Sequence, residues 1–268
     1  MMAADALADI VALRRRRLSE AKEKTSMSAM ERMAKSAPES EDFTAAVVRP
    51  GRIALIAEMK RRSPSAGSIR EAYNPAAIAA AYEEGGAAAL SVLTEPDKFG
   101  GELSDIRRAK TACRLPVLRK DFIFDPYQIA EARANGADAV LLIAEMLSAS
   151  EMAELASYAR EMQVEPLVEV FSESVLDAAL ASGAKLIGIN SRNLRTLEMR
   201  PDNFSRLAPR IPADRYVIAE SGIKTADDVE KLKSLRVSAM LVGESILKQT
   251  DLSAAVRVLA NAGGGVKA

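Results

Sequence analysis

Histidine is absent from this 268-residue chain, and Cys113 is its only cysteine. Without histidine, the sequence excludes Ser-His-Asp and Cys-His catalytic groups, imidazole general bases and histidine-rich zinc sites. A single cysteine excludes an internal disulfide and a thiolate metal cluster, and we interpret Cys113 as a small buried hydrophobic residue. If the protein is an enzyme, its lysine, aspartate and glutamate side chains must transfer its protons.

Neither sign of charge is in excess, because 37 lysine and arginine residues balance 37 aspartate and glutamate residues. The chain therefore offers no net field for a nucleic acid backbone or an anionic membrane, and local groups must hold any anionic substrate. The amino terminus lacks a secretory signal, and no run approaches the roughly 18 apolar residues of a membrane-spanning helix. We expect a soluble cytoplasmic protein that binds neither nucleic acid nor membrane.

Short aliphatic runs recur along the chain and alternate with helix-like stretches such as Pro75–Glu84, Pro126–Asn135, Ser148–Met162 and Thr225–Ser234. This alternation is typical of βα units, and eight units in about 250 residues are typical of a closed (β/α)8 TIM barrel of the α/β class. A doubly wound sheet stays an alternative, although the glycine-rich dinucleotide turn that it favours is absent after the first run. The eight runs are Ile53–Lys60, Ala89–Thr94, Pro116–Phe122, Ala139–Glu145, Glu165–Val170, Leu186–Arg192, Tyr216–Gly222 and Ala239–Ile246.

Residues 1–48 precede the first predicted strand and contain two predicted helices, Ala3–Lys24 and Ser28–Lys35, with no glycine-rich linker. We expect a single barrel domain over residues 1–268, with residues 1–48 as an N-terminal helical extension. The run Arg14–Arg17 has the charge of a nucleic-acid patch, but it covers all sides of one helical turn and has acidic neighbours. We interpret it as a solvated helix face.

The candidate chemistry lies at the carboxyl ends of the predicted strands, where barrel enzymes hold their catalytic groups. A single charged strand end is usually a solvated cap, but six that converge on one rim are costly to desolvate unless they serve a ligand. Glu58 and Lys60 share a face by strand alternation. Lys120 and Glu169 are candidates for acid or base work, with a structural ion pair as the alternative. The strand-end residues are Glu58, Lys60, Lys120, Asp121, Glu145, Glu169, Asn190, Arg192, Glu220 and Ser221.

Glycine-containing segments at the last two strand ends are candidates for a phosphate site. Glu220-Ser221-Gly222 ends the seventh run and Gly243-Glu244-Ser245 lies in the eighth, where barrels often bind phosphate through backbone N–H groups. Glycine lets the backbone approach an anion closely, although each segment alone is also consistent with a tight turn. Ser63-Pro64-Ser65 and Gly67 offer hydroxyl donors in a loop after the first run.

The segment Ile56-Ala57-Glu58-Met59-Lys60-Arg61-Arg62-Ser63-Pro64-Ser65 strongly resembles the signature of indole-3-glycerol phosphate synthases, written roughly as I-A-E-x-K-x-x-S-P-S. Further segments resemble motifs of this family in the family's order, so the resemblance covers about residues 50–250, with looser likeness before them. Met59 and Asn193 depart from residues common in the family, but neither departure removes a proton-transfer group. The further segments are Ser91–Thr94 with Phe99–Gly101, Leu118–Ile123, Glu165–Val170, Ile187–Leu194, Ala219–Ile223 and Leu241–Ser245.

The resemblance implies ring closure, decarboxylation and dehydration of 1-(2-carboxyphenylamino)-1-deoxyribulose 5-phosphate to indole-3-glycerol phosphate in tryptophan biosynthesis, without metal or cofactor. It implies that Lys120 is the general acid of ring closure and that Glu169 stabilises charge or accepts a proton. Glu58 and Lys60 match a pair for substrate binding and dehydration. The remaining matches are Asn190, Glu220 and Ser221 as active-site groups, Ser63, Gly222, Gly243 and the backbone of Glu244 as the phosphate site, and Arg192 as a contact to the substrate carboxylate.

The chemistry fits these residue types, because ring closure needs a proton donor at the ketone oxygen and charge stabilisation, which lysine and glutamate supply. The alternatives are another phosphate-binding barrel enzyme, similar to phosphoribosylanthranilate isomerase, and a barrel that binds without catalysis. The isomerase should lack Glu58, Lys60, Lys120 and Glu169 in these contexts, and an intact proton-transfer set argues against a silent barrel. We expect a monomer that acts on a phosphorylated small molecule.

Overall fold

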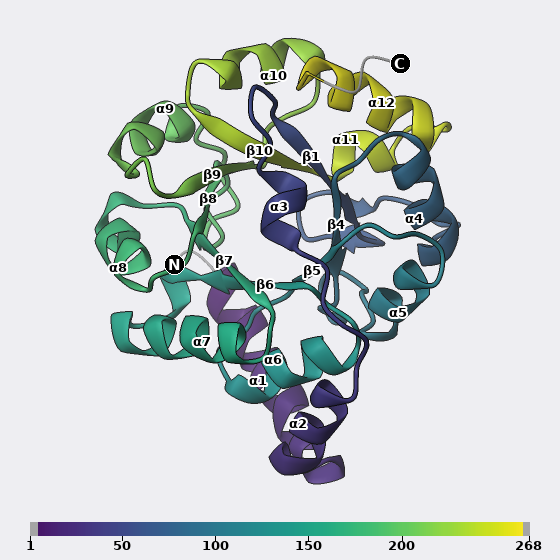
Figure 1. Cartoon of the computed structure of the whole chain (residues 1–268), viewed down its shortest axis with the longest axis vertical. Helices are drawn as coiled ribbons and strands as arrows, with labels where there is room; N and C mark the ends of the chain where they lie inside the picture. The colour runs from purple at the N-terminus through teal and green to yellow at the C-terminus, as the bar shows by residue number, and fades with distance from the viewer. Residues whose placement is uncertain (1–4, 265–268) are drawn as a thin grey trace.

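The computed structural model describes residues 5–264 of the chain, and within them eight parallel strands close into a barrel (Figure 1). The barrel strands are β1 (Ala54–Met59), β4 (Ala89–Leu93), β5 (Val117–Lys120), β6 (Ala139–Ile143), β7 (Glu165–Val170), β8 (Leu186–Asn190), β9 (Tyr216–Glu220) and β10 (Val237–Val242). Their order around the barrel is β1-β10-β9-β8-β7-β6-β5-β4, and β1 closes it by pairing in parallel with both β4 and β10. The predicted (β/α)8 fold is confirmed.

Most strands end before the predicted runs do, because the last residues of those runs already belong to loops. β1 ends at Met59, so Lys60 begins the following loop. β10 begins at Val237, two residues before the predicted run, and its register with β9 is irregular between Val237 and Ala239. Its run was also predicted too long, because Glu244–Leu247 forms a short helix after Gly243.

Helices cover the outside of the barrel and alternate with its strands (Figure 1). Some of them begin at side chains that accept hydrogen bonds from otherwise unpaired backbone N–H groups, such as Asn74 before Pro75, and Ser148 in a capping box with Glu151. The helices after β1 are α4 (Pro75–Glu84), α5 (Ser104–Lys110), α6 (Pro126–Ala134), α7 (Ala149–Glu161), α8 (Leu176–Ala181), α9 (Asn203–Leu207), α10 (Ala226–Lys233), α11 (Glu244–Leu247) and α12 (Leu252–Ala262), with 3-10 turns η1 (Ala144–Met146), η2 (Glu173–Val175) and η3 (Ala208–Arg210).

Within the described residues, three helices precede β1: α1 (Ala6–Lys24), α2 (Met27–Lys35) and α3 (Phe43–Val47). The first two were predicted, although the first two residues of the predicted Ala3–Lys24 helix lie outside the described residues. The short α3 was not predicted. It lies in front of the strands in Figure 1, and its Phe43 and Val47 are buried in the cluster that fills the barrel interior.

Helix α1 is bound to the barrel at several points along its length. At its start, the Ala6 N–H donates to the Arg195 carbonyl in the loop after β8, 3.1 Å away, and the Arg195 guanidinium pairs with Asp5. Further along, Leu7 and Ile10 belong to the same apolar cluster as Phe122, just after β5. The extension is therefore packed against the residues that follow β5 and β8.

The interpretation of Arg14–Arg17 as a solvated face is wrong for Arg14. Arg14 is only 7% exposed and pairs with Asp121 at 3.0 Å, while Arg15 and Arg16 are exposed and Arg17 pairs with Asp97 at 2.7 Å. Because the partner of Arg14 is 107 residues away, local charge balance did not indicate it. The interpretation of Cys113 as a small buried residue is confirmed.

Candidate active site

A cavity of about 930 Å³ lies at the carboxyl ends of the barrel strands. It collects side chains from strands and loops that are far apart in the sequence. Two of the predicted strand-end residues, Glu145 and Glu169, are not part of its wall, and Glu169 is only 1% exposed. The predicted residues that line the cavity are Glu58, Lys60, Ser63, Lys120, Asn190, Arg192, Glu220, Ser221, Gly222, Gly243 and Glu244.

Lys120 lies between two carboxyl groups in the barrel interior. Its Nζ is 2.7 Å from Glu169 Oε2 and 3.2 Å from Glu220 Oε2. Asn190 Nδ2 donates to the other oxygen of Glu169 at 3.0 Å. Because these residues end the neighbouring strands β7, β8 and β9 and nearby β5, the barrel geometry itself brings them together.

The environment separates the proton affinities of these groups. Burial alone would lower the pKa of Lys120, but the charges of Glu169 and Glu220 offset this and hold its pKa well above the usual value. Burial raises the pKa of Glu169, yet the Lys120 charge and hydrogen bonds bring the net value below normal. Burial, opposed by Lys120 and aided by the Glu169 charge, raises the pKa of Glu220 to about 8. Lys120 therefore keeps its proton at neutral pH, and Glu220 holds a proton more tightly than Glu169 does.

Lys60 is held by a different carboxylate. Its Nζ donates to Glu58 Oε1 at 2.5 Å, and the Glu58 carbonyl accepts the Tyr82 hydroxyl at 3.1 Å. A Cβ atom at Gly243 would lie 2.7 Å from Glu58 Oε1, so a glycine is needed there to leave room for this carboxylate. The two lysines thus come from β5 and the end of β1, with separate carboxylate partners.

The predicted phosphate-binding residues lie at one side of the cavity, where β9, β10 and β1 are neighbours. Ser221 and Gly222 follow β9 with φ values of 66° and 84°, in the left-handed region that favours glycine. Ser63 belongs to a hairpin of β2 (Arg62–Ser63) and β3 (Gly67–Ser68), and its hydroxyl accepts the Ala66 N–H at 3.2 Å. The structure brings these residues to one wall, with backbone and hydroxyl donors suited to an anion.

Arg192 lines the cavity from the loop after β8. Its N–H donates to Asn190 Oδ1 at 2.8 Å, and its guanidinium donates to the Leu197 carbonyl at 2.9 Å. These contacts fix the loop, which returns to bridge Arg192 with Met199. The arrangement leaves a cation at the cavity wall beside Asn190.

An aromatic and aliphatic wall, which was not predicted from the sequence as part of the site, forms another part of the cavity. Phe99 and Phe122 lie with ring centroids 6.2 Å apart and planes tilted by 35°, and Ile143 and Leu194 line the same cavity. The position of Phe122, two residues after Lys120, was the available signal. This wall suits an aromatic ring.

Glu145, another predicted strand-end residue, serves the backbone. Its carboxylate accepts the N–H groups of Phe171 at 2.7 Å and Ser172 at 2.9 Å, after β7. Burial raises its pKa in spite of these hydrogen bonds. Glu145 therefore shapes the loop after Glu169.

Within residues 5–264, no group of three or more cysteine, aspartate or glutamate side chains is arranged to hold a metal ion. No helix in the same residues is long and apolar enough to cross a membrane.

The closed barrel and its rim of buried ionisable groups define a (β/α)8-barrel protein with its site at the carboxyl ends of the strands. The family model of indole-3-glycerol phosphate synthase matches residues 7–259, and the chain belongs to this family. It is 48% identical to the indole-3-glycerol phosphate synthase of Rhodopirellula baltica over 226 residues, covering 84% of this chain and 87% of the relative. It is 42% identical to that of Polaromonas naphthalenivorans over 258 residues, covering 95% and 98%.

Solved structures show the fold alone. The 3-hexulose-6-phosphate synthase of Salmonella typhimurium superimposes with a TM-score of 0.64 at 13% identity, over 78% of this chain and 98% of that one. The barrel thus recurs in proteins of very different sequence. The sequence had left two alternatives, an isomerase-like enzyme and a barrel that binds without catalysis. The family match favours neither of them.

Proposed function

We propose that this barrel converts 1-(2-carboxyphenylamino)-1-deoxyribulose 5-phosphate to indole-3-glycerol phosphate, with Lys120 as the acid of ring closure. The observation that carries the proposal is the Lys120 ammonium, held by Glu169 and Glu220 at the cavity wall. Because its pKa lies well above the usual value, Lys120 keeps its proton until a substrate oxygen accepts it. Family membership supports the overall reaction.

In the first step, the ring carbon that bears the carboxylate attacks the ketone carbon, and Lys120 donates its proton to the ketone oxygen. A carbon–carbon bond forms, the ketone becomes a hydroxyl, and positive charge develops on the anilino nitrogen. A carboxylate beside Lys120 can stabilise this charge, and Glu169 Oε2 lies 2.7 Å from Lys120 Nζ. Glu169 is ionised and fits this role.

Loss of carbon dioxide and water completes the reaction. The bond to the carboxylate carbon breaks, and its electron pair restores the aromatic ring. The hydroxyl then leaves as water after protonation, while a base accepts the proton lost from the neighbouring carbon. We assign this dehydration to the Glu58 and Lys60 pair, because its atoms are 2.5 Å apart and line the cavity on the other side.

The cavity walls suit the two ends of such a substrate. We assign the phosphate to Ser63, Gly222, Gly243 and the backbone of Glu244, and the carboxylate to Arg192, all of which line the cavity. The Phe99 and Phe122 rings suit the substrate's aromatic ring. We assign Asn190 and Ser221 to positioning groups at the site, since Asn190 holds Glu169 and Ser221 begins the turn at Gly222.

We also propose that the protein is a cytoplasmic monomer and that residues 1–268 form one domain, with residues 1–48 as its extension. The packing of Phe43 and Val47 inside the barrel and the buried Arg14–Asp121 pair support a single domain. The equal numbers of acidic and basic residues argue against a nucleic acid partner. Sedimentation velocity tests the monomer, and one cooperative unfolding transition tests the single domain.

The assignment is tested by steady-state turnover, followed by indole fluorescence with EDTA present, and by direct substrate binding. Lys120→Met should bind substrate while its kcat falls about 10²- to 10⁴-fold, the range for a lost general acid. Lys60→Met should not show this combination of retained substrate binding and a much lower kcat. Lys110→Met is a matched control. Lys110 pairs with Asp138 at a distance of 3.0 Å, and Lys110 is not one of the residues that line the cavity.

Two results would contradict the proposal. A folded Lys120→Met that keeps more than about a tenth of the wild-type kcat would transfer the acid role to another group, with Lys60 the first suspect. Activity that EDTA abolishes and a divalent ion restores would contradict a reaction that uses only side chains.

A further inference from the structure

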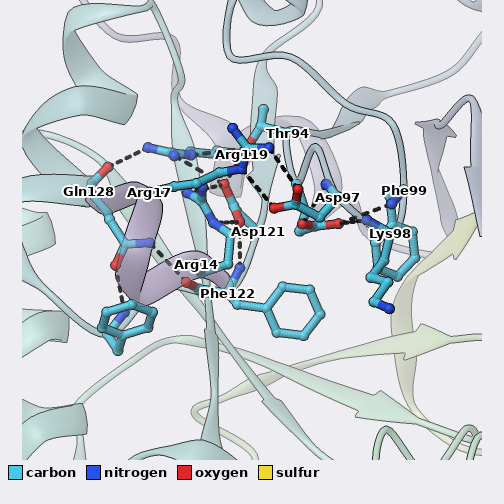
Figure 2. A network of polar contacts seen from close by, with 12 residues as sticks. Arg14, Arg17, Thr94, Asp97, Lys98, Phe99, Arg119, Asp121, Phe122 and Gln128 are labelled. Atoms are coloured by element: carbon cyan, nitrogen blue, oxygen red, sulfur yellow. Dashed lines mark hydrogen bonds and ion pairs between the residues drawn. The ribbon is translucent and has the colours of Figure 1, made fainter. Parts of the chain in front are cut away.

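Thr94, at the end of the neighbouring strand, contacts Arg119 and Asp121, the residues on either side of Lys120 in the sequence (Figure 2). It directly follows β4, and its N–H donates to the Lys120 carbonyl at 3.1 Å. Its hydroxyl donates to Asp121 Oδ2 at 2.6 Å and accepts Arg119 Nε at 3.1 Å. One threonine is therefore bound to three consecutive residues of β5 and the loop after it.

Strand geometry turns these contacts into a constraint on Lys120. Arg119 and Asp121 both lie one residue from Lys120, so their side chains point away from the face on which Lys120 lies. They pair with one another at 3.0 Å, and Asp121 Oδ1 also accepts the Phe122 N–H at 2.8 Å. The backbone on both sides of Lys120 is thereby held while its side chain extends toward Glu169.

The charges around Thr94 balance. Asp121 pairs with Arg14 from α1 at 3.0 Å (Figure 2). Arg119 also pairs with Glu131 at 2.9 Å. Burial raises the pKa of Asp121, but the two guanidinium charges bring its net value below normal, so the carboxylate stays ionised. Two guanidinium groups thus balance two carboxylates, and the neutral Thr94 hydroxyl forms hydrogen bonds with one guanidinium group and one carboxylate.

Thr94 is 4% exposed and, within the described chain, is not among the residues that line the cavity. Any effect of its hydroxyl on the reaction must therefore pass through its neighbours. We propose that Thr94 is a positioning residue for Lys120: its hydroxyl, by joining Arg119 to Asp121, fixes the direction in which the Lys120 ammonium enters the cavity. This inference rests on the proposed function, in which Lys120 is the acid.

The first test compares Thr94→Val with Thr94→Ser. Valine keeps the volume but removes the hydroxyl, and a displaced Lys120 should lower kcat about tenfold or more with substrate KM changed less than about twofold. Serine keeps the hydroxyl and should restore kcat to near the wild-type value. If Thr94→Val does not fold, Thr94→Ala removes the same hydroxyl without a new methyl group beside the two charges.

The second test separates positioning from loss of stability. The residual rate of Thr94→Val with Lys120→Met should equal that of Lys120→Met alone, because Thr94 acts through the missing ammonium. Ser182→Ala is the matched control: Ser182 is equally 4% exposed, and its hydroxyl donates to Ala179 near the opposite end of the barrel. It should lower the melting temperature and leave kcat unchanged.

The outcomes are distinguishable. The positioning role would be overturned by a folded Thr94→Val with wild-type kcat. It would also be overturned if Thr94→Val and Lys120→Met lowered the rate of the double variant by the product of their separate effects. Either result would leave the proposed function intact. A Lys120→Met variant with near wild-type turnover would overturn the acid assignment itself, and with it this inference.

Discussion

Gly188 in β8 lies against the carboxyl group of Glu220 in β9, so closely that a Cβ atom at Gly188 would overlap Glu220 Oε1. Gly188→Ala should therefore displace Glu220 from Lys120 and lower kcat by about 10- to 100-fold, as expected for a misplaced catalytic group. Steady-state kinetics on folded protein measures this. Gly85→Ala is the control, because its Cβ would lie 2.6 Å from the Ser253 carbonyl oxygen, outside the cavity lining. Equal losses of kcat in both variants would refute the prediction.

Glu220 should also make stability depend on pH. Its pKa is about 8 in the folded protein and about 4.3 when unfolded, so the folded state binds this proton more tightly. The contribution of Glu220 to the free energy of unfolding is complete below about pH 4.3 and is lost as pH rises toward 8. In urea titrations followed by circular dichroism, the free energy of unfolding of the wild type, relative to that of Glu220→Gln, should fall from pH 5 to pH 8. Parallel pH profiles for the two proteins would contradict this.

If Gly222 belongs to the phosphate site, a substitution there should weaken substrate binding before it slows the chemical step. Gly222→Asp adds bulk and negative charge where Gly222 has a φ of 84°, and we expect substrate KM to rise at least about tenfold. Gly51→Asp controls for backbone strain, because Gly51 has a φ of 69° and open space around it. An unchanged KM in Gly222→Asp would remove Gly222 from the phosphate site.

The buried Arg14 predicts a stability effect that its exposed neighbours lack. Arg14→Met removes one hydrogen bond and the ion pair with Asp121, which keeps Arg119 as a partner, so we expect a loss of about 1 to 3 kcal/mol in the free energy of unfolding. Arg16→Met, at an exposed position, should change it by less than about 0.5 kcal/mol. Urea denaturation compares them, and similar losses in both would show that the pair contributes little.

Strand ends could be predicted from the sequence because a closed parallel barrel brings them together whatever their separation along the chain. Lys120, Asn190 and Glu220 lie among the last residues of separate aliphatic runs, and the barrel alone places them around one cavity. The helix Pro75–Glu84 was likewise predicted to the residue, since Asn74 and Pro75 mark its start locally.

Pairings across long sequence separations could not be predicted in this way. Arg14 has a local pattern typical of a solvated helix, and its partner Asp121 is 107 residues distant. The proton on Glu220 depends on its burial and on its distances from Lys120 and Glu169, which strand assignments do not contain. Helix α3 is only five residues long, too short for helical periodicity to reveal.

The contacts of α1 also set an order for folding during synthesis. Asp5 and Ala6 bind Arg195, and Arg14 binds Asp121, so α1 leaves the ribosome well before the residues that it binds. Domains fold as their chain emerges, and contacts of high sequence separation form late. A nascent chain that ends before residue 195 therefore carries α1 without its last docking partner, and α1 is among the last helices to reach its final packing.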